Sequence, residues 1–231
     1  MKNGTGVEAG RIAPARSGVL TDVSPYRVQA SRVKRVMDVL IASIAAIFLL
    51  PLMACIAILV RLTSPGPALF AQRRCGLNGR VFECYKFRTM RVDAAERLER
   101  LLATDPNAAM EWARYQKLRN DPRVTPLGRF LRKTSLDELP QLVNILRNEM
   151  SVIGPRPITS DEIFRYGPDF HYYTAVRPGV LGLWQVNGRN RLTYDQRVAM
   201  DVRYVREWSI WLDITIFAKA APVVLFGAGA Y

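Results

Sequence analysis

The longest apolar stretch of the chain covers residues 39–60, VLIASIAAIFLLPLMACIAILV, and contains no charged residue. An unbroken helix of this length covers roughly 33 Å, which is enough to cross the hydrocarbon layer of a membrane. The stretch lies too far from the first residue, and is too long, to be the apolar part of a signal peptide. Pro51 lies just past its middle, where the loss of a backbone donor predicts a kink or a break in the helix.

Basic residues flank this stretch on both sides, with Arg32, Lys34 and Arg35 before it and Arg61 directly after it. Positive charge favours the cytoplasmic side of a membrane, so both ends favour the same side. A helix that enters the membrane, bends at Pro51 and returns satisfies both ends, whereas an ordinary span satisfies only one. The residues alone leave these two arrangements evenly balanced, with a buried core helix as a third interpretation.

Shorter patterns after the apolar stretch predict a small mixed domain. Strands are expected at residues 68–71 and 81–87, joined by a turn at Asn78-Gly79, which is a strong hairpin signal. Charged helical segments are expected at about 94–103 and 108–119, on either side of Asp105-Pro106.

Two further apolar patterns predict helices. Leu139, Leu142, Val143 and Leu146 recur at the i, i+3, i+4, i+7 spacing of one helix face. Residues 208–226 are largely aromatic and aliphatic, and they fit either the membrane interface or the core.

The charge of the chain narrows the choice of partners. Its 231 residues carry 33 Lys and Arg against 20 Asp and Glu, a formal net charge of +13. Such a chain favours acidic partners: nucleic acid, anionic lipid or a phosphorylated substrate. The three cysteines lack the paired spacing of a zinc or thioredoxin motif, so we interpret them as reduced thiols facing the cytosol.

Two adjacent carboxylates stand in the segment Ser135-Leu136-Asp137-Glu138-Leu139-Pro140-Gln141-Leu142. Ser135 and Glu138 have the spacing of a capping box, which is a purely structural interpretation. Pro140 would then lie inside the helix, whereas a helix that starts at Pro140 leaves both carboxylates just ahead of it. Either placement favours the ionised form, which suits a nucleophile. Neighbouring helical residues point about 100° apart, so we expect Asp137 and Glu138 to have different roles.

Arginine recurs beside glycine, proline or amide residues in the predicted loops. Rigid loops that present planar guanidinium groups can bind the oxygens of a diphosphate, although a chain of this charge also carries arginine widely. No P-loop, dinucleotide fingerprint or histidine metal motif is present, and the single histidine, His171, is interpreted as structural. The loop residues concerned are Arg132, Arg156, Pro157, Arg177, Gln185, Asn187 and Arg189.

Taken together, these segments resemble the monotopic bacterial sugar transferases, or polyprenyl-phosphate phosphoglycosyl transferases. The resemblance begins at Lys34-Arg35-Val36-Met37-Asp38 and ends near Asp213. Residues 121–125 and 39–46 are most similar to the enzymes that start exopolysaccharide synthesis with galactose-1-phosphate. The other matching segments are residues 85–90, 135–142, 150–157 and 177–190.

The resemblance implies an activity and a set of roles. A sugar-1-phosphate moves from a UDP-sugar to undecaprenyl phosphate through a covalent aspartyl intermediate, with magnesium as cofactor. Galactose is favoured, and glucose or an N-acetylated sugar is the alternative. Asp137 aligns with the nucleophile, and Glu138 with an acidic neighbour that binds magnesium or positions the nucleophile. The remaining expected substrate-binding residues are Lys86, Arg88, Arg132, Arg156, Pro157, Arg177, Gln185, Asn187 and Arg189.

The resemblance also favours the re-entrant helix over the ordinary span. We therefore expect an α+β monotopic protein, with a mostly helical catalytic domain and a short β-hairpin on the cytoplasmic face of the bacterial inner membrane. The expected parts are a flexible basic tail at 1–31 in contact with anionic lipids, a membrane helix at 32–62 broken at Pro51, and a catalytic domain at 63–231 with an interfacial C-terminal helix. Family members often carry serine before the proline, whereas Leu50 stands here.

Two rival classes remain open at this point. The first is a basic, membrane-anchored nucleic-acid-binding protein, which the charge fits, although the chain has no zinc finger or RNP motif; as an enzyme, the protein is expected to bind no nucleic acid. The second is an anchored domain outside the cytoplasm. The sequence gives no indication of the oligomeric state.

Overall fold

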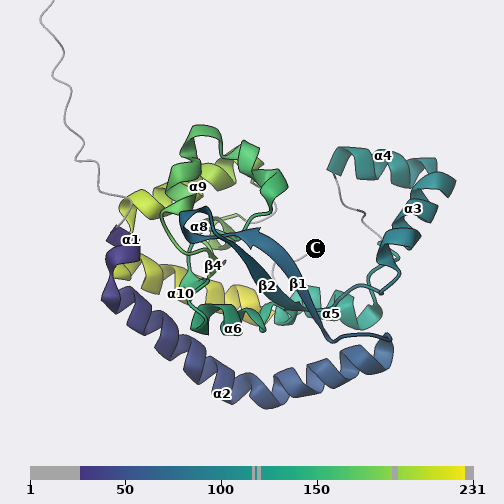
Figure 1. Cartoon of the computed structure of the whole chain (residues 1–231), viewed down its shortest axis with the longest axis horizontal. Coiled ribbons are helices and arrows are strands. Elements are labelled where there is room, and N and C mark those ends of the chain that lie inside the picture. Colours follow the sequence, from purple (N-terminus) through teal and green to yellow (C-terminus); the bar gives the residue numbers. More distant parts are fainter. Residues whose placement is uncertain (1–26, 116–117, 119–120, 189–191, 227–231) are drawn as a thin grey trace, which may run out of the picture.

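The structure is a computed structural model of the chain, and it describes residues 27–115, 118, 121–188 and 192–226. The described part is mostly helical, with two small two-stranded sheets and one long apolar helix near the N-terminus (Figure 1). This confirms the expected α+β composition. Of the expected basic tail, only residues 27–31 lie within the described part, and they include α1 (Arg27–Ala30).

The long helix, α2 (Arg32–Thr63), contains the whole apolar stretch. Ser31 caps its first turn, because the Ser31 hydroxyl accepts a hydrogen bond from the Lys34 backbone N–H at 3.2 Å. The helix continues through Pro51, which corrects the expected break: proline removes one hydrogen bond but its fixed φ suits a helix, so a bend can replace an interruption. Figure 1 shows α2 as a curved ribbon that passes beneath the domain.

Both ends of α2 pack against the domain, while its middle does not. Ala42 belongs to the main core, and Ile56 and Val60 join a second cluster with Phe87 and Leu131. Between these docked ends, Ile47 and Phe48 are 71% and 78% exposed. Among the described residues, α2 is the one helix that is long and apolar enough to cross a membrane.

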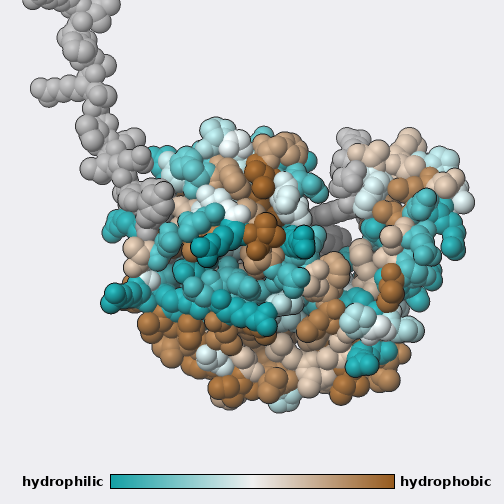
Figure 2. All heavy atoms as spheres, in the orientation of Figure 1, coloured by the Kyte–Doolittle hydropathy of each residue, from teal (hydrophilic) through white to brown (hydrophobic). Residues whose placement is uncertain are grey.

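Other helices extend this exposed apolar surface. The exposed side chains come from α5 (Pro126–Thr134), α6 (Gln141–Leu146) and α10 (Ile210–Phe226). Figure 2 shows the same edge of the molecule as a continuous hydrophobic band below a hydrophilic body. We call this surface the apolar face. Besides the middle of α2, it includes Phe130, Val143, Leu146, Trp211, Ile214 and Phe217.

The predicted hairpin is present as β1 (Leu69–Cys75) and β2 (Val81–Phe87), paired antiparallel with Cys75 opposite Val81. The connection is the short η1 (Leu77–Gly79), in which Asn78 and Gly79 have φ of 55° and 72°. Glycine and asparagine tolerate this left-handed conformation, which explains why the pair marks the turn.

The next two helices are also present where the sequence predicts them. They are α3 (Ala94–Thr104) and α4 (Pro106–Tyr115), which form an arm that projects from the body in Figure 1. The Asp105 carboxylate accepts hydrogen bonds from the backbone N–H groups of Asn107 and Ala108, and Pro106 needs no donor at the first helical position.

The rest of the domain surrounds a second, parallel pair of strands, β3 (Ser151–Ile153) and β4 (Gly179–Leu181). The main core joins these strands to α2, α6 and the last two helices through residues such as Ala42, Ile145, Val152, Tyr204 and Ile216. The remaining elements are η3 (Ser160–Arg165), η4 (Gly167–Asp169), α7 (Phe170–Thr174), α8 (Leu183–Val186) and α9 (Tyr194–Glu207).

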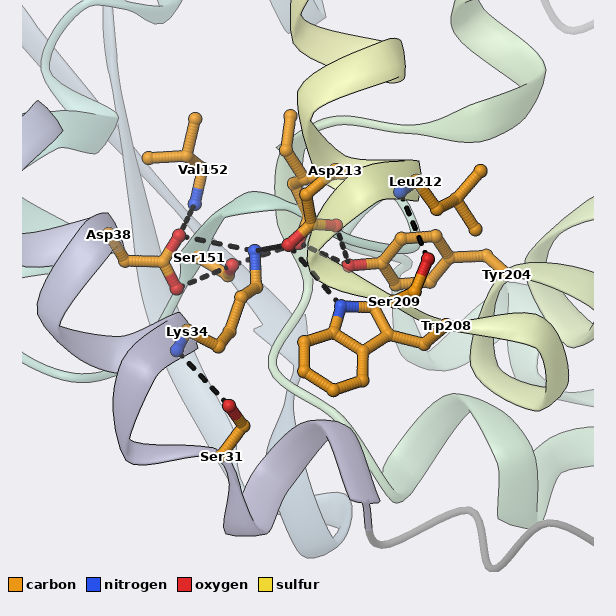
Figure 3. A network of polar contacts seen from close by, with 11 residues as sticks. Ser31, Lys34, Asp38, Ser151, Val152, Tyr204, Trp208, Ser209, Leu212 and Asp213 are labelled. Atoms are coloured by element: carbon orange, nitrogen blue, oxygen red, sulfur yellow. Dashed lines mark hydrogen bonds and ion pairs between the residues drawn. The ribbon is translucent and has the colours of Figure 1, made fainter.

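A buried polar network fixes the start of α2 to this core (Figure 3). The Lys34 ammonium lies 3.2 Å from Asp38 Oδ1 and 2.9 Å from Asp213 Oδ2. Asp38 also accepts hydrogen bonds from Ser151 Oγ and the Val152 backbone N–H. The network therefore ties α2 to β3 and α10. Tyr204 and Trp208 complete it by donating to the Asp213 carboxylate.

Candidate active site

The two adjacent carboxylates lie in a sharp turn between two helices. Ser135 ends α5 in the left-handed conformation, with φ 58° and ψ 14°, and η2 (Leu136–Glu138) follows at once. The Ser135 side chain makes no capping hydrogen bond, so the capping-box interpretation is wrong. The alternative is confirmed: α6 begins directly after Pro140, and both carboxylates precede it.

The long apolar helix α2 supports this turn. Leu136 and Leu139, on either side of the carboxylates, pack against the cluster that contains Ile56 and Val60 of α2. The apolar side chains of the turn thus face α2, and the position of the carboxylates depends on the docking of this helix.

The Glu138 carboxylate is surrounded by cations. Its Oε1 lies 2.6 Å from Lys86 Nζ and 4.0 Å from Arg156 Nη1. Lys86 comes from β2 and Arg156 from the loop after β3, so three distant segments meet here. Together with Arg74, Cys84, Gln141, Pro157 and Val180, these side chains line one cleft.

The two carboxylates differ in their protonation. Burial raises the pKa of Asp137 to about 6, and the neighbouring Glu138 charge adds to this, against the opposing effects of Lys86 and Arg132. Burial also acts to raise the pKa of Glu138, but Lys86 and Arg156 outweigh it and lower that pKa below its ordinary value. The expectation that the turn favours ionisation therefore holds for Glu138 and is wrong for Asp137, which is half protonated near pH 6. The reason is that Asp137 is only 9% exposed.

The loop that carries Arg156 is held by a close approach of two glycines. A Cβ on Gly179 would lie 2.0 Å from the Gly154 nitrogen, so neither β3 nor β4 tolerates a side chain there. The Gly179 N–H donates to the Pro155 carbonyl at 2.8 Å. This packing fixes the residues on either side of Gly154, including Arg156 in the loop after β3.

The structure thus brings together several of the residues that the sequence singles out. Lys86, Arg156 and Pro157 line the cleft with Glu138. Arg132 lies on α5, where its Nε donates to Thr89 Oγ1 at 2.8 Å, and its charge acts on Asp137.

Other predicted residues lie elsewhere. The Arg88 guanidinium is buried against the carbonyl oxygens of Ser64 and Pro65, where it braces the end of α2. Arg177 lies at the opposite end of α2, with its Nε donating to the Asn148 carbonyl at 3.1 Å. Neither side chain lines the cleft, and a role of Arg88 or Arg177 in binding the sugar donor stays a prediction.

The amide residues of the last predicted loop form a separate group. Gln185 lies on α8, and Asn187 ends this helix by donating from Nδ2 to the Leu183 carbonyl at 2.9 Å. Neither is among the residues that line the cleft. Arg189 lies outside the described residues.

Two of the cleft residues that sequence reasoning missed have long polar side chains, Arg74 and Gln141. Arg74 is near the end of β1, where its Nη1 donates to the Pro157 carbonyl at 3.0 Å. The alternation of side chains along a strand could have placed it on the same face as Gln72. Gln141 follows Pro140 directly and is 2% exposed, a burial that composition does not indicate.

Glu138 is the residue of the cleft lining that could hold a magnesium ion together with a substrate. The described residues contain no group of three His, Cys, Asp or Glu side chains that could enclose an ion. Magnesium does not need one, because it commonly uses one or two carboxylates, several waters and the phosphates of a substrate. Within the described part of the chain, both contacts of Glu138 with cations involve Oε1, which leaves Oε2 without a charged partner. Glu138 therefore fits magnesium in the presence of a diphosphate.

A cationic cleft lined by Glu138, next to Asp137 and supported by a long apolar helix, suits an enzyme that handles phosphorylated substrates. Comparison with known proteins gives the particular class. A family model described as "Bacterial sugar transferase" matches residues 29–227, and the chain belongs to this family.

Individual relatives agree with this assignment. The "Undecaprenyl-phosphate galactose phosphotransferase" of Salmonella typhimurium is 50% identical over 86% of this chain and 41% of its own length. The "Exopolysaccharide production protein ExoY" of Rhizobium meliloti is 48% identical over 86% of this chain and 88% of its own length. The "UDP-glucose:undecaprenyl-phosphate glucose-1-phosphate transferase" of Escherichia coli is 38% identical over 79% and 38%. The chain thus spans about two fifths of the Salmonella and Escherichia proteins but most of ExoY.

Proposed function

We propose that this protein transfers a sugar-1-phosphate from a UDP-sugar to undecaprenyl phosphate, as the first membrane step of exopolysaccharide synthesis. The observation that carries the proposal is the turn at Asp137 and Glu138, which is supported by α2 and lies beside the Lys86 and Arg156 cations. The names of the related proteins, which refer to galactose phosphate transfer and to exopolysaccharide production, support the same reaction. Membership of a transferase family favours the enzyme over the nucleic-acid-binding alternative.

The reaction starts with Asp137 in its ionised form. One carboxylate oxygen attacks the β-phosphorus of the UDP-sugar, the bond from that phosphorus to the bridging oxygen breaks, and UMP leaves with the electron pair. The resulting acyl phosphate retains the sugar. An oxygen of undecaprenyl phosphate then attacks the same phosphorus and displaces the Asp137 carboxylate. Two steps suit this pair of substrates, because the soluble donor can leave before the lipid acceptor arrives.

The cations of the cleft stabilise charge on the phosphates during both steps. Lys86, Arg156 and Arg74 line one cleft, and preorganised cations of this kind need no rearrangement as charge develops. Magnesium held by Glu138 would neutralise further charge on the diphosphate. The negative charge of Glu138 also helps to raise the pKa of Asp137. A magnesium ion held by Glu138 would instead favour the ionised form of Asp137, so the two roles of Glu138 act on the nucleophile in opposite directions.

We propose that α2 enters the cytoplasmic leaflet and returns to the same side. Two observations support this: both ends of α2 dock on one domain, and the exposed apolar side chains lie between those ends. An ordinary span needs its ends on opposite sides of the bilayer. The apolar surfaces of α5, α6 and α10 then lie in the interface, and the catalytic domain faces the cytoplasm, where UDP-sugars occur.

Cysteine labelling tests this topology. Single cysteines introduced at Gln29 and at the exposed Asn107 are expected to react with a membrane-impermeant maleimide only after the inner membrane of whole cells is opened. Cys55 is exposed, so it is first replaced by serine. Labelling of either position in intact cells contradicts the re-entrant arrangement.

The sugar is tested by measuring UMP release with undecaprenyl phosphate and a panel of UDP-sugars. UDP-galactose is expected to give the highest kcat/KM, because the relatives that share about half of their residues with this chain include a galactose phosphotransferase. Higher values with UDP-glucose or with an N-acetylated donor would reassign the sugar. Absence of UMP release from every donor would reject the reaction.

The raised pKa of Asp137 predicts a pH dependence. Formation of the intermediate requires the carboxylate, so its rate with limiting UDP-sugar should rise with pH and reach half its maximum near pH 6. The Lys86→Gln variant should move this midpoint upward, because Lys86 lowers the pKa of Asp137. A rate that stays constant through pH 6, or a midpoint unmoved in Lys86→Gln, contradicts the assignment.

The Asp137 carboxyl group also affects the stability of the fold, and its contribution falls with rising pH while the reaction rate rises. The folded protein holds the Asp137 proton more tightly than the unfolded chain, so this group's contribution to stability falls as pH rises from 3.8 to about 6. Acid inactivation near pH 6 therefore reflects loss of the nucleophile and is expected to be reversible.

A further inference from the structure

A second group of cations lies at the head of α2, apart from the carboxylate cleft. Here Arg35 and Arg177 line a pocket with Ser31, Lys34, Asp38 and Ser151. Arg35 Nη2 donates to the Ile145 carbonyl at 2.8 Å, and Arg177 Nε donates to the Asn148 carbonyl at 3.1 Å. Both guanidinium groups are thus fixed by carbonyl oxygens near the end of α6, and both face the same pocket.

Neither arginine has an acidic partner in the part of the chain that the structure describes, since no ion pair there includes Arg35 or Arg177. The carboxylates closest to them in the fold are already engaged: Asp38 and Asp213 share the Lys34 ammonium (Figure 3). At Arg177, the Asp38 charge offsets only part of the repulsion from Arg35. Burial lowers the pKa of Arg177, and the Arg35 charge lowers it further against the weaker effect of Asp38.

One nitrogen in this pocket has no acceptor. Arg35 Nη1 is buried and, among the described residues, donates to no group. A buried donor without an acceptor costs free energy. An anion placed between Arg35 and Arg177 would accept from this nitrogen and remove the repulsion between the two cations.

The pocket also lies at the edge of the apolar face. Val33 and Val36, on the same turns of α2 as Arg35, are each 56% exposed, and Leu146 beside the carbonyl acceptors is 42% exposed. In the membrane arrangement proposed above, this edge is at the depth of the lipid headgroups. An anion that reaches the pocket from this side carries an acyl or prenyl chain.

We propose that Arg35 and Arg177 together bind the phosphate group of a membrane lipid. The proposal rests on the membrane position given under Proposed function, and it assigns to Arg177 a lipid contact in place of its expected role at the sugar donor. A guanidinium pair suits phosphate because each planar fork can donate two parallel hydrogen bonds to its oxygens. The phosphate belongs either to a phospholipid headgroup or to a polyprenyl phosphate.

The site is connected to the cleft through β3 and β4. Arg177 lines the lipid pocket, and Gly179, two residues later, lines the cleft. In the same way, Ile153 lines the lipid pocket and Pro157, four residues later, lines the cleft. A lipid phosphate at Arg177 therefore fixes the distance of the Arg156 loop from the membrane surface.

Titration calorimetry of the full chain in detergent tests the proposal. The probes are dihexanoyl phosphatidylglycerol, farnesyl phosphate and sodium phosphate at equal ionic strength. At least one lipid phosphate is expected to bind the unchanged protein, and the tighter of the two identifies the source. Arg35→Gln and Arg177→Gln should each weaken that binding about tenfold or more, as expected for the loss of a charge-assisted hydrogen bond.

Two further variants make the test specific. Arg177→Lys keeps the positive charge but loses the planar guanidinium fork, so it should also bind the lipid phosphate more weakly. Because the charge is kept, weaker binding by this variant cannot be attributed to misfolding caused by loss of the charge. Arg100→Gln removes an exposed arginine of α3 and should bind as tightly as the unchanged protein. Undiminished binding in Arg35→Gln and Arg177→Gln, or equal affinity for sodium phosphate, overturns the proposal. Release of UMP by a preparation that binds neither lipid would reject this site and leave the transferase activity standing.

Discussion

Replacing Asp137 with asparagine is expected to abolish attachment of the sugar-phosphate to the protein. The carboxamide has nearly the same shape but cannot form the acyl phosphate, so turnover should fall by at least about a thousandfold. The measurement uses a UDP-sugar labelled in the sugar and no lipid acceptor, followed by intact-protein mass spectrometry. The unchanged protein should gain the mass of one hexose phosphate, and subsequent undecaprenyl phosphate should remove it.

The matched control is Asp161→Asn, which makes the same change at an exposed aspartate of η3. It should be labelled like the unchanged protein. Label that persists in Asp137→Asn would place the nucleophile elsewhere. Complete absence of label from a preparation that still makes lipid-linked sugar would mean direct transfer between the two substrates.

Replacing Lys34 with methionine is expected to destabilise the protein strongly. The ammonium is 5% exposed and lies between Asp38 and Asp213, so its removal leaves two buried carboxylates without a cation. Removing one partner of such a buried group typically costs about 3–5 kcal/mol. The midpoint of thermal unfolding, followed by circular dichroism in detergent, should fall accordingly.

Two variants separate charge from packing in this experiment. Lys133→Met, at an exposed position of α5, should leave the midpoint nearly unchanged. The double variant Lys34→Met with Asp213→Asn should recover part of the loss, because one of the two carboxylates is then neutral. A midpoint in Lys34→Met equal to that of Lys133→Met would show that the network contributes little to stability.

The features that the sequence predicts well depend on neighbouring residues. The Asn78-Gly79 turn, the division of α3 from α4 at Asp105-Pro106, and the start of α6 after Pro140 all follow from the backbone chemistry of the residues present. The carboxylate pair could be singled out for the same reason. A local pattern is sufficient where the constraint is local.

The apolar spacing around α6 does not show which of its residues are buried. Val143 and Leu146 are 39% and 42% exposed, whereas Asn144 is fully buried. The Asn144 side chain accepts from the Tyr85 N–H and donates to the Glu83 carbonyl, so it satisfies the open edge of β2 as a neighbouring strand would. The apolar side of α6 instead belongs to the apolar face. Periodicity locates a face but does not identify what covers it.

The roles of the arginines could not be separated by sequence. Arg88, Arg156 and Arg177 all lie in segments that carry the family resemblance, yet one braces α2, one lies in the cleft and one lines the pocket at the head of α2. Their surroundings come from segments far away in the chain. The pairing of Lys34 with Asp213 is of the same kind, because a contact between the first long helix and the last has no local signal.

That pairing also has a bearing on biosynthesis. Lys34 leaves the ribosome well before Asp213, because most of the domain lies between them in the chain. Until α10 has been synthesised, α2 lacks its acidic partner Asp213, and the contacts that join α2, β3 and α10 are incomplete. A chain that stops before α10 therefore cannot complete the network that fixes β3, the strand that leads to Arg156.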